Sequence, residues 1–200
     1  MKALKVHIPV ALVLALGACA KPPQADIDAA KAAVDSAAKN ADIALYAADT
    51  LKTAKDKLAQ MQADIDAQAK KGAVSRRYDN VKKLALEAKS AAETAKTDAG
   101  RNKEQAKADA TAMIDALKKA FPEAEKKIAA AKKVRGIALN FTALARQMAN
   151  AKAVVTAAEK DLADGNYAAA KEKAASVQAQ MTEAEKAVAD AVQAATQRKK

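Results

Sequence analysis

The sequence predicts an all-α protein, an elongated, alanine-rich antiparallel helical bundle of about six helices. Two features of the composition favour helices over sheets. About three residues in ten are alanine, the strongest helix former, whereas only 2% of the 200 residues are aromatic and Trp is absent. A third observation is periodicity: Val81, Leu84, Ala88, Ala92 and Ala95 recur at the spacing of an amphipathic helix. A sheet protein is therefore excluded.

The first nineteen residues are typical of a secretion signal rather than of a folded element. Lys2 and Lys5 give a positive start, and the apolar run from Ile8 to Leu16 is too short to cross a bilayer as a helix. Two small residues then precede Cys19, which is the only cysteine of the chain. We therefore expect residues 1–18 to be a signal peptide. Cleavage of an ordinary secretory signal, at Ala18 or Ala20, would instead leave a free thiol.

The tetrapeptide Leu16-Gly17-Ala18-Cys19 resembles the lipobox of bacterial lipoproteins, in which a leucine lies three residues before a lipidated cysteine. The resemblance implies that signal peptidase recognises Leu16, Gly17 and Ala18 and cleaves before Cys19. It also implies a diacylglycerol on the Cys19 sulfur and an acylated new N-terminus, and several acyl chains give stable membrane anchoring. Ala20 stands where an aspartate resembles an inner-membrane retention signal, which points to the periplasmic face of the outer membrane.

After the leader, we expect three segments. Residues 19–24 form a lipid-anchored tether stiffened by Pro22-Pro23. Residues 25–121 form a first helical unit with a long third helix, and residues 122–200 form a second helical unit. The helices are expected near 26–41, 49–71, 75–120, 122–136, 141–163 and 166–197.

Local signals set those helix boundaries. Ser75 is a favourable N-cap for the third helix, and Gly100 lies inside that helix, where it would either be tolerated or break it. Pro122 is expected at the first position of a fourth helix, because proline lacks only an N–H that is unpaired there anyway. Gly165 is expected to end the fifth helix.

A weak internal repeat also emerges. The tetrapeptide at 43–46 (Ile-Ala-Leu-Tyr) resembles the one at 137–140 (Ile-Ala-Leu-Asn). Each is followed by a helix, then by a glycine (Gly72 or Gly165), and shortly afterwards by a tyrosine (Tyr78 or Tyr167). The pattern predicts one helical-hairpin unit used twice, although chance similarity is an alternative in so alanine-rich a chain.

The sequence offers little for catalysis, and we predict a protein that is not an enzyme. Cleavage of the leader would remove His7, the only histidine, and with it the usual general base and zinc ligand. No phosphate-binding loop or nucleophile motif is present. The closely spaced acid pairs lie among lysines and alanines and are interpreted as solvated helix faces: Asp26/Asp28, Asp64/Asp66 and Glu123/Glu125. No cofactor or metal site is predicted.

Charge suggests weak binding rather than a dedicated site. The chain has 35 basic and 24 acidic residues, for a formal charge of +11, and loss of Lys2 and Lys5 would lower the charge to +9. Basic doublets are scattered, with acids interleaved, which is typical of a soluble helical surface. We expect weak affinity for anionic polymers or lipids and no nucleic-acid partner behind a secretion signal.

The chain ends Gln197-Arg198-Lys199-Lys200, which resembles the end of the major murein lipoprotein. That resemblance implies covalent attachment of Lys200 to peptidoglycan. The alternative is that these cations simply stabilise a helix C-terminus, by about 0.3–1 kcal/mol each.

Taken whole, the chain resembles the small lipoproteins of domain-of-unknown-function family 4398. The resemblance rests on the lipobox, the Ala/Lys helix Ala29–Ala41, Tyr46 ahead of Leu51, and the turn Gly165-Asn166-Tyr167. It implies a periplasm-facing helical lipoprotein and supplies no activity. We therefore expect a lipid-anchored envelope spacer or protein-interaction scaffold, whose partner is an envelope protein or peptidoglycan. The alternative is a binder of anionic cell-wall polymer or lipopolysaccharide through basic helix faces.

Overall fold

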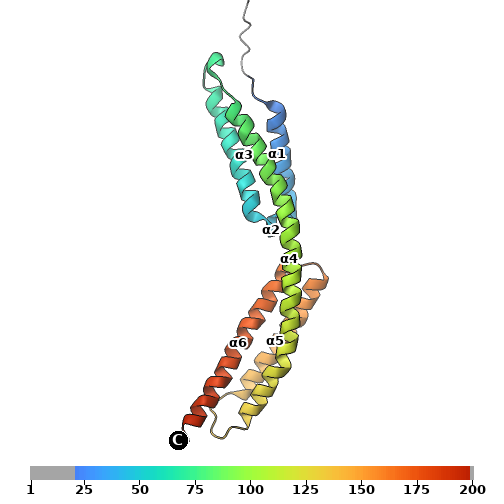
Figure 1. Ribbon diagram of the computed structural model, residues 1–200, viewed down its shortest axis with the longest axis vertical. Helices are drawn as coiled ribbons and strands as arrows, with labels where there is room; N and C mark the ends of the chain where they lie inside the picture. Colours follow the sequence, from blue (N-terminus) through green and yellow to red (C-terminus); the bar gives the residue numbers. More distant parts are fainter. Residues whose placement is uncertain (1–20, 199–200) are drawn as a thin grey trace, which may run out of the picture. The chain divides into compact units, whose positions relative to one another are not determined.

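The computed structural model describes residues 21–198, and the elements in this range are helical (Figure 1). This confirms the predicted all-α helical bundle. The residues proposed for lipidation and processing, Leu16–Cys19, and Lys200 lie outside the described residues. The elements are α1 (Gln24–Lys39), α2 (Ala41–Tyr46), α3 (Ala48–Ala69), the short 3₁₀ helix η1 (Ala73–Ser75), α4 (Asp79–Lys132), α5 (Phe141–Ala163) and α6 (Tyr167–Gln197).

The described residues divide into two compact units. Unit 1 comprises residues 21–44 and 48–96, and unit 2 comprises residues 45–47 and 97–198. The division on α4 therefore falls between Lys96 and Thr97, and the expected units 25–121 and 122–200 meet inside α4, where that helix is unbroken.

Unit 1 contains α1, α2 up to Ala44, α3 and the first part of α4. Asn40 ends α1, and its side-chain Oδ1 accepts hydrogen bonds from the backbone N–H groups of Asp42 (2.9 Å) and Ile43 (3.2 Å). This side chain satisfies donors that the start of α2 would otherwise leave unpaired. The chain thus reverses direction, and α3 packs against α1. Ile27, Val34 and Met61 are among the buried apolar residues of the unit.

Unit 2 contains the rest of α4 with α5 and α6, and four ion pairs define its topology. Lys118–Glu159 and Glu125–Lys152 join α4 to α5 in opposite chain order, so these helices are antiparallel. Asp109–Lys171 and Lys127–Glu185 join α4 to α6 in the same chain order, so these helices are parallel. Beneath the ion pairs lies a buried apolar cluster that includes Ile114, Leu117, Phe121, Met148, Val155, Val177 and Met181.

Two expected helix boundaries, at Pro122 and at Ser75, are wrong. Pro122 lies inside α4 and does not begin a new helix. Proline costs about 3 kcal/mol in a helix interior, but the flanking Phe121 and Ala124 are buried in the unit 2 cluster, and this packing offsets the cost. Gly100, for which both outcomes were open, is tolerated inside α4. Its position on an exposed face leaves the helix intact.

Ser75 is not the N-cap of the long helix. It belongs to η1, and α4 begins only at Asp79. The Arg76 side chain explains the delay, because it donates hydrogen bonds to the carbonyl groups of Lys71 (3.1 Å) and Ala69 (3.3 Å). Residues 70–76 are therefore used to cap the end of α3.

The buried stripes of α4 and α6 share one register. Six buried positions of α4 and six of α6 match at a constant offset, and both series alternate spacings of three and four residues. Tyr78 and Tyr167 each lie three residues before the first matched position. Any two amphipathic helices have such spacings, so the predicted repeat of a helical hairpin stays a prediction. The positions are Val81, Ala85, Ala88, Ala92, Ala95 and Ala99 in α4, and Ala170, Ala174, Val177, Met181, Ala184 and Val188 in α6.

Candidate functional site

The predicted lipidation site, Cys19, lies outside the described part of the chain, two residues before Lys21. Lys21, Pro22 and Pro23 lead into α1, and Pro23 is its N-cap. The expected tether thus ends where a helix begins. No helix in residues 21–198 is long and apolar enough to cross a membrane.

The candidate carboxylate pairs are held by neighbouring side chains rather than aimed at one another. Asp64 accepts hydrogen bonds from Gln68 (3.1 Å) and Asn80 (3.0 Å), and Asp28 accepts one from Gln24. Glu125 belongs to the α4–α5 ion pair with Lys152. Among residues 21–198, no group of three or more His, Cys, Asp or Glu side chains could hold a metal ion.

Ion pairing also shifts the pKa of several exposed groups. A hydrogen bond from Lys171, supported by one from Gln105, lowers the pKa of the Asp109 carboxyl. A hydrogen bond from Lys57 lowers the pKa of Glu87 in unit 1. These groups lie on the solvent face, so the shifts reflect structural pairs between helices rather than a reactive centre.

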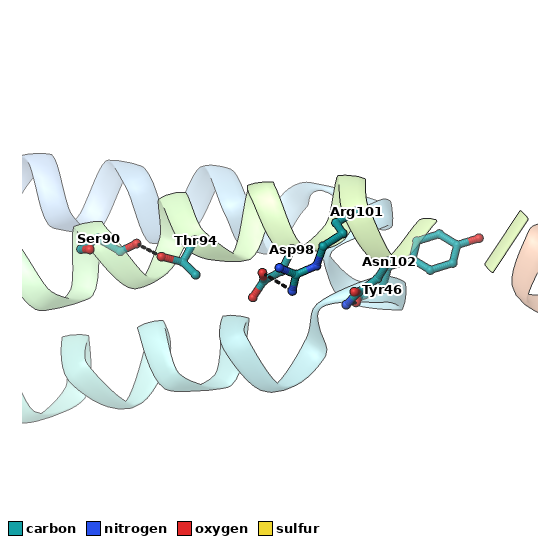
Figure 2. Close-up of polar contacts among 6 residues, drawn as sticks. All are labelled: Tyr46, Ser90, Thr94, Asp98, Arg101 and Asn102. Carbon is teal, nitrogen blue, oxygen red and sulfur yellow. Dashed lines mark hydrogen bonds and ion pairs between the residues drawn. The ribbon is translucent and has the colours of Figure 1, made fainter. Parts of the chain in front are cut away.

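A polar contact that the sequence did not reveal fixes the segment 45–47 within unit 2. The Asn102 side-chain Nδ2 donates to the backbone carbonyl of Tyr46 at 2.8 Å, and Figure 2 shows the two residues side by side at α4. The neighbouring Arg101 pairs with Asp98 along the same helix at 2.8 Å. Asn102 falls in the polar stretch 96–107, which is a regular part of α4.

A groove of unit 2 runs between α4 and α6. Near the α4 C-terminus it has a volume of about 780 Å³, and its lining combines Val134, Val188 and Val192 with the charged residues Lys127 and Glu185. A groove of unit 1, between α1 and α4, is likewise lined by polar and charged residues as well as alanines: Ser36, Asn40, Glu93 and Lys96.

The connection between α3 and α4 is the most exposed basic segment of unit 1. It carries Lys70, Lys71, Arg76 and Arg77 around Val74, whose side chain is 84% exposed. These two basic doublets lie on one connection between helices.

No family model matches the chain, and no curated protein or solved structure is significantly similar to it.

Proposed function

We propose that the chain is a lipid-anchored helical scaffold or spacer of the bacterial cell envelope. In this proposal Cys19 carries the lipid, and the helical units extend from the periplasmic face of the outer membrane. The observation that carries it is the segment 16–19, which follows a charged start and a short apolar run. That segment is separated from α1 by only a few residues.

The helical units support a role in holding or spacing rather than in reacting. The inter-helix contacts of unit 2 are an apolar seam flanked by exposed ion pairs. All buried side-chain polar atoms of the described residues have hydrogen-bond partners. Fully satisfied polar groups and thin alanine seams favour a stable helical body. The groove between α4 and α6 offers that body a surface for a protein partner.

Metabolic labelling tests the anchor. The full chain is expressed in a bacterium fed radiolabelled palmitate, beside Cys19→Ser and a matched control, Ala20→Ser. We expect label on the wild type and on A20S, and none on C19S, since only the Cys19 sulfur accepts the diacylglycerol. A mature chain that begins at residue 19 or 21 with an unmodified N-terminus and no label would overturn the proposal.

A second candidate is attachment to an anionic cell-wall polymer, including a covalent bond through Lys200. It is favoured by the cations Lys132, Lys133 and Arg135 after α4, which form no ion pair among the described residues. Deletion of Lys200 tests the covalent form. Peptidoglycan boiled in detergent should then lose the protein, and an unchanged bound amount would contradict the covalent bond.

A further inference from the structure

The connection between α3 and α4 is a distinctive feature of the first repeat. Residues 70–78 join these helices, whereas residues 164–166 suffice to join the equivalent pair, α5 and α6. The extra residues include two lysines, two arginines and an apolar tip, in the sequence Lys-Lys-Gly-Ala-Val-Ser-Arg-Arg from 70 to 77. We name this segment the basic connection. The short turn of the second repeat is Asp-Gly-Asn and carries no cation.

The basic connection has a defined conformation. Besides the Arg76 bonds to the α3 carbonyl groups, the Arg77 backbone N–H donates to Oε1 of Gln68 at 3.1 Å. Gln68 is itself buried, and its Nε2 donates to Asp64. The Ser75 backbone N–H donates to the Gly72 carbonyl at 2.9 Å, which closes the turn around Val74. The tip is therefore presented by a fixed turn.

Within this turn the charges have no carboxylate partner. None of Lys70, Lys71, Arg76 and Arg77 forms an ion pair with another described residue, although lysines on the helix faces do, as in Lys57–Glu87 and Lys52–Asp56. Val74 is 84% exposed, against 61% for Leu45 and 52% for Leu86, the other exposed large apolar side chains of the described residues. An exposed apolar tip flanked by cations that have no carboxylate partner suits an anionic, amphipathic surface.

The position of the basic connection identifies that surface. The end of α1 and Asn40 lie against α4 near Ala92–Lys96, and Figure 1 shows that α1 and α4 run in the same direction within unit 1. The start of α1 therefore lies at the same end of unit 1 as the start of α4 and the basic connection (Figure 1). Lys21 adds a further cation at this end. If Cys19 carries a lipid, only a few residues separate that lipid from this end.

We infer that the basic connection docks on the headgroups of an anionic lipid bilayer, with Val74 entering the interface. This inference rests on the proposed lipid anchor, because the anchor brings the membrane to this end of unit 1. The lysine ammonium groups pair with lipid phosphates, and each contributes to binding while it lies within a Debye length of the surface. The docking orients unit 1 on the membrane, which an acyl anchor with a Pro-Pro tether would not do alone.

Vesicle binding tests the inference without the anchor. The protein used is the chain from residue 19 onward with Cys19→Ser, which keeps every described residue and has no acyl chain. It is mixed with vesicles of phosphatidylglycerol and phosphatidylcholine in equal parts, or of phosphatidylcholine alone. We expect cosedimentation with the anionic vesicles only. The double variant Lys70→Gln/Lys71→Gln should weaken binding by roughly tenfold or more, since each lysine near the surface contributes.

A matched double variant separates the connection from net charge. Lys39 and Lys96 lie at the opposite end of unit 1, and Lys39→Gln/Lys96→Gln removes the same charge. We expect this variant to retain binding within about twofold. Equal weakening by both doubles would overturn the inference, because it would mean that overall charge alone attracts the protein. Glycerol phosphate at matched ionic strength should not release the protein with the unchanged basic connection from the vesicles. Such release would also overturn the inference, because a soluble phosphate would then replace the lipid surface.

Insertion of the apolar tip into the membrane is tested separately, by tryptophan fluorescence. The chain contains no tryptophan, so Val74→Trp places a single fluorophore at the tip, and Leu86→Trp places one on an exposed face of α4. We expect a blue shift with anionic vesicles for V74W and none for L86W. An unshifted V74W spectrum on bound protein would contradict insertion of the tip. If the wild-type chain takes up palmitate but the vesicle tests fail, the docking is rejected and the anchor stands. If the vesicles bind the protein as expected but the wild-type chain takes up no palmitate, the anchor is rejected and the docking stands.

Discussion

The Tyr46 hydroxyl accepts a hydrogen bond from the backbone N–H of Ala168, at 3.4 Å, across 122 positions of sequence. Ala168 lies in the first turn of α6, where backbone N–H groups have no partner within the helix. The Asn166 side chain, at the N-cap, makes no capping hydrogen bond. The Tyr46 side chain therefore caps the N-terminus of α6.

Removing this hydroxyl should loosen the start of α6. In Tyr46→Phe the ring remains, the Ala168 N–H loses its acceptor, and we expect a loss of about 0.5–1.5 kcal/mol of stability. Hydrogen exchange at the Ala168 amide measures it directly and should become faster. Tyr167→Phe removes a hydroxyl one residue away while keeping the ring near Lys107, so it should leave that amide unchanged. Equal exchange in wild type and Y46F would contradict the capping role.

The sequence predicted best where a boundary depends on neighbouring residues. α5 has the expected bounds Phe141–Ala163, and α6 follows Asn166 as expected. Here Asn140 accepts from the Ala143 N–H at 2.9 Å, and Gly165 takes a positive φ of 82°. Both features are local, and both are visible in a short window of sequence.

The sequence predicted poorly where distant packing decides. The expected break at Pro122 is absent because Phe121 and Ala124 are buried against α5 and α6, and local propensity carries no information on that packing. The Tyr46–Ala168 contact joins residues too far apart for periodicity to relate them. For the candidate site, the doublets at 70–71 and 76–77 were visible as residues, but only the turn held by Arg76 and Gln68 brings them together.

Replacement of Gly100 by alanine should stabilise the protein. It lies inside α4, and a Cβ there would meet no atom within 4 Å. Gly100→Ala should therefore stabilise the protein by about 0.5–1 kcal/mol, because alanine loses less backbone entropy than glycine in a helix. The urea midpoint should rise. The matched change Gly165→Ala should lower it, because the positive φ at Gly165 strains any residue with a Cβ. A midpoint that falls in G100A would contradict the continuous helix.

Acid should weaken the contact between α4 and α6. Lys171 lowers the pKa of Asp109 in the folded state, so Asp109 binds its proton less readily there than in the unfolded chain. Its contribution to stability is therefore present above the unfolded pKa, about 3.9, and is lost as pH falls through the lower folded pKa. Melting temperatures followed across this acidic range should fall less steeply in Asp109→Asn than in wild type. An identical slope in both proteins would show that the pair contributes nothing, as many exposed pairs do.

The apolar seam of unit 2 should respond to the loss of even a small side chain. Val177 is fully buried, among Ile114, Leu117 and Val155, and Val177→Ala removes two methyl groups and leaves a cavity. The expected cost is about 2 kcal/mol, from roughly 0.8 kcal/mol for each buried carbon plus the cavity. Val74→Ala is the same chemical change at an exposed position and should leave the free energy of unfolding within about 0.5 kcal/mol of wild type. Alanine occupies much of this seam, so a few larger side chains account for most of its buried apolar area. Truncating any one of them should therefore lower the free energy of unfolding measurably. Urea unfolding of both variants measures the difference, and an equal response would mean that α6 is not packed on α4 and α5 through Val177.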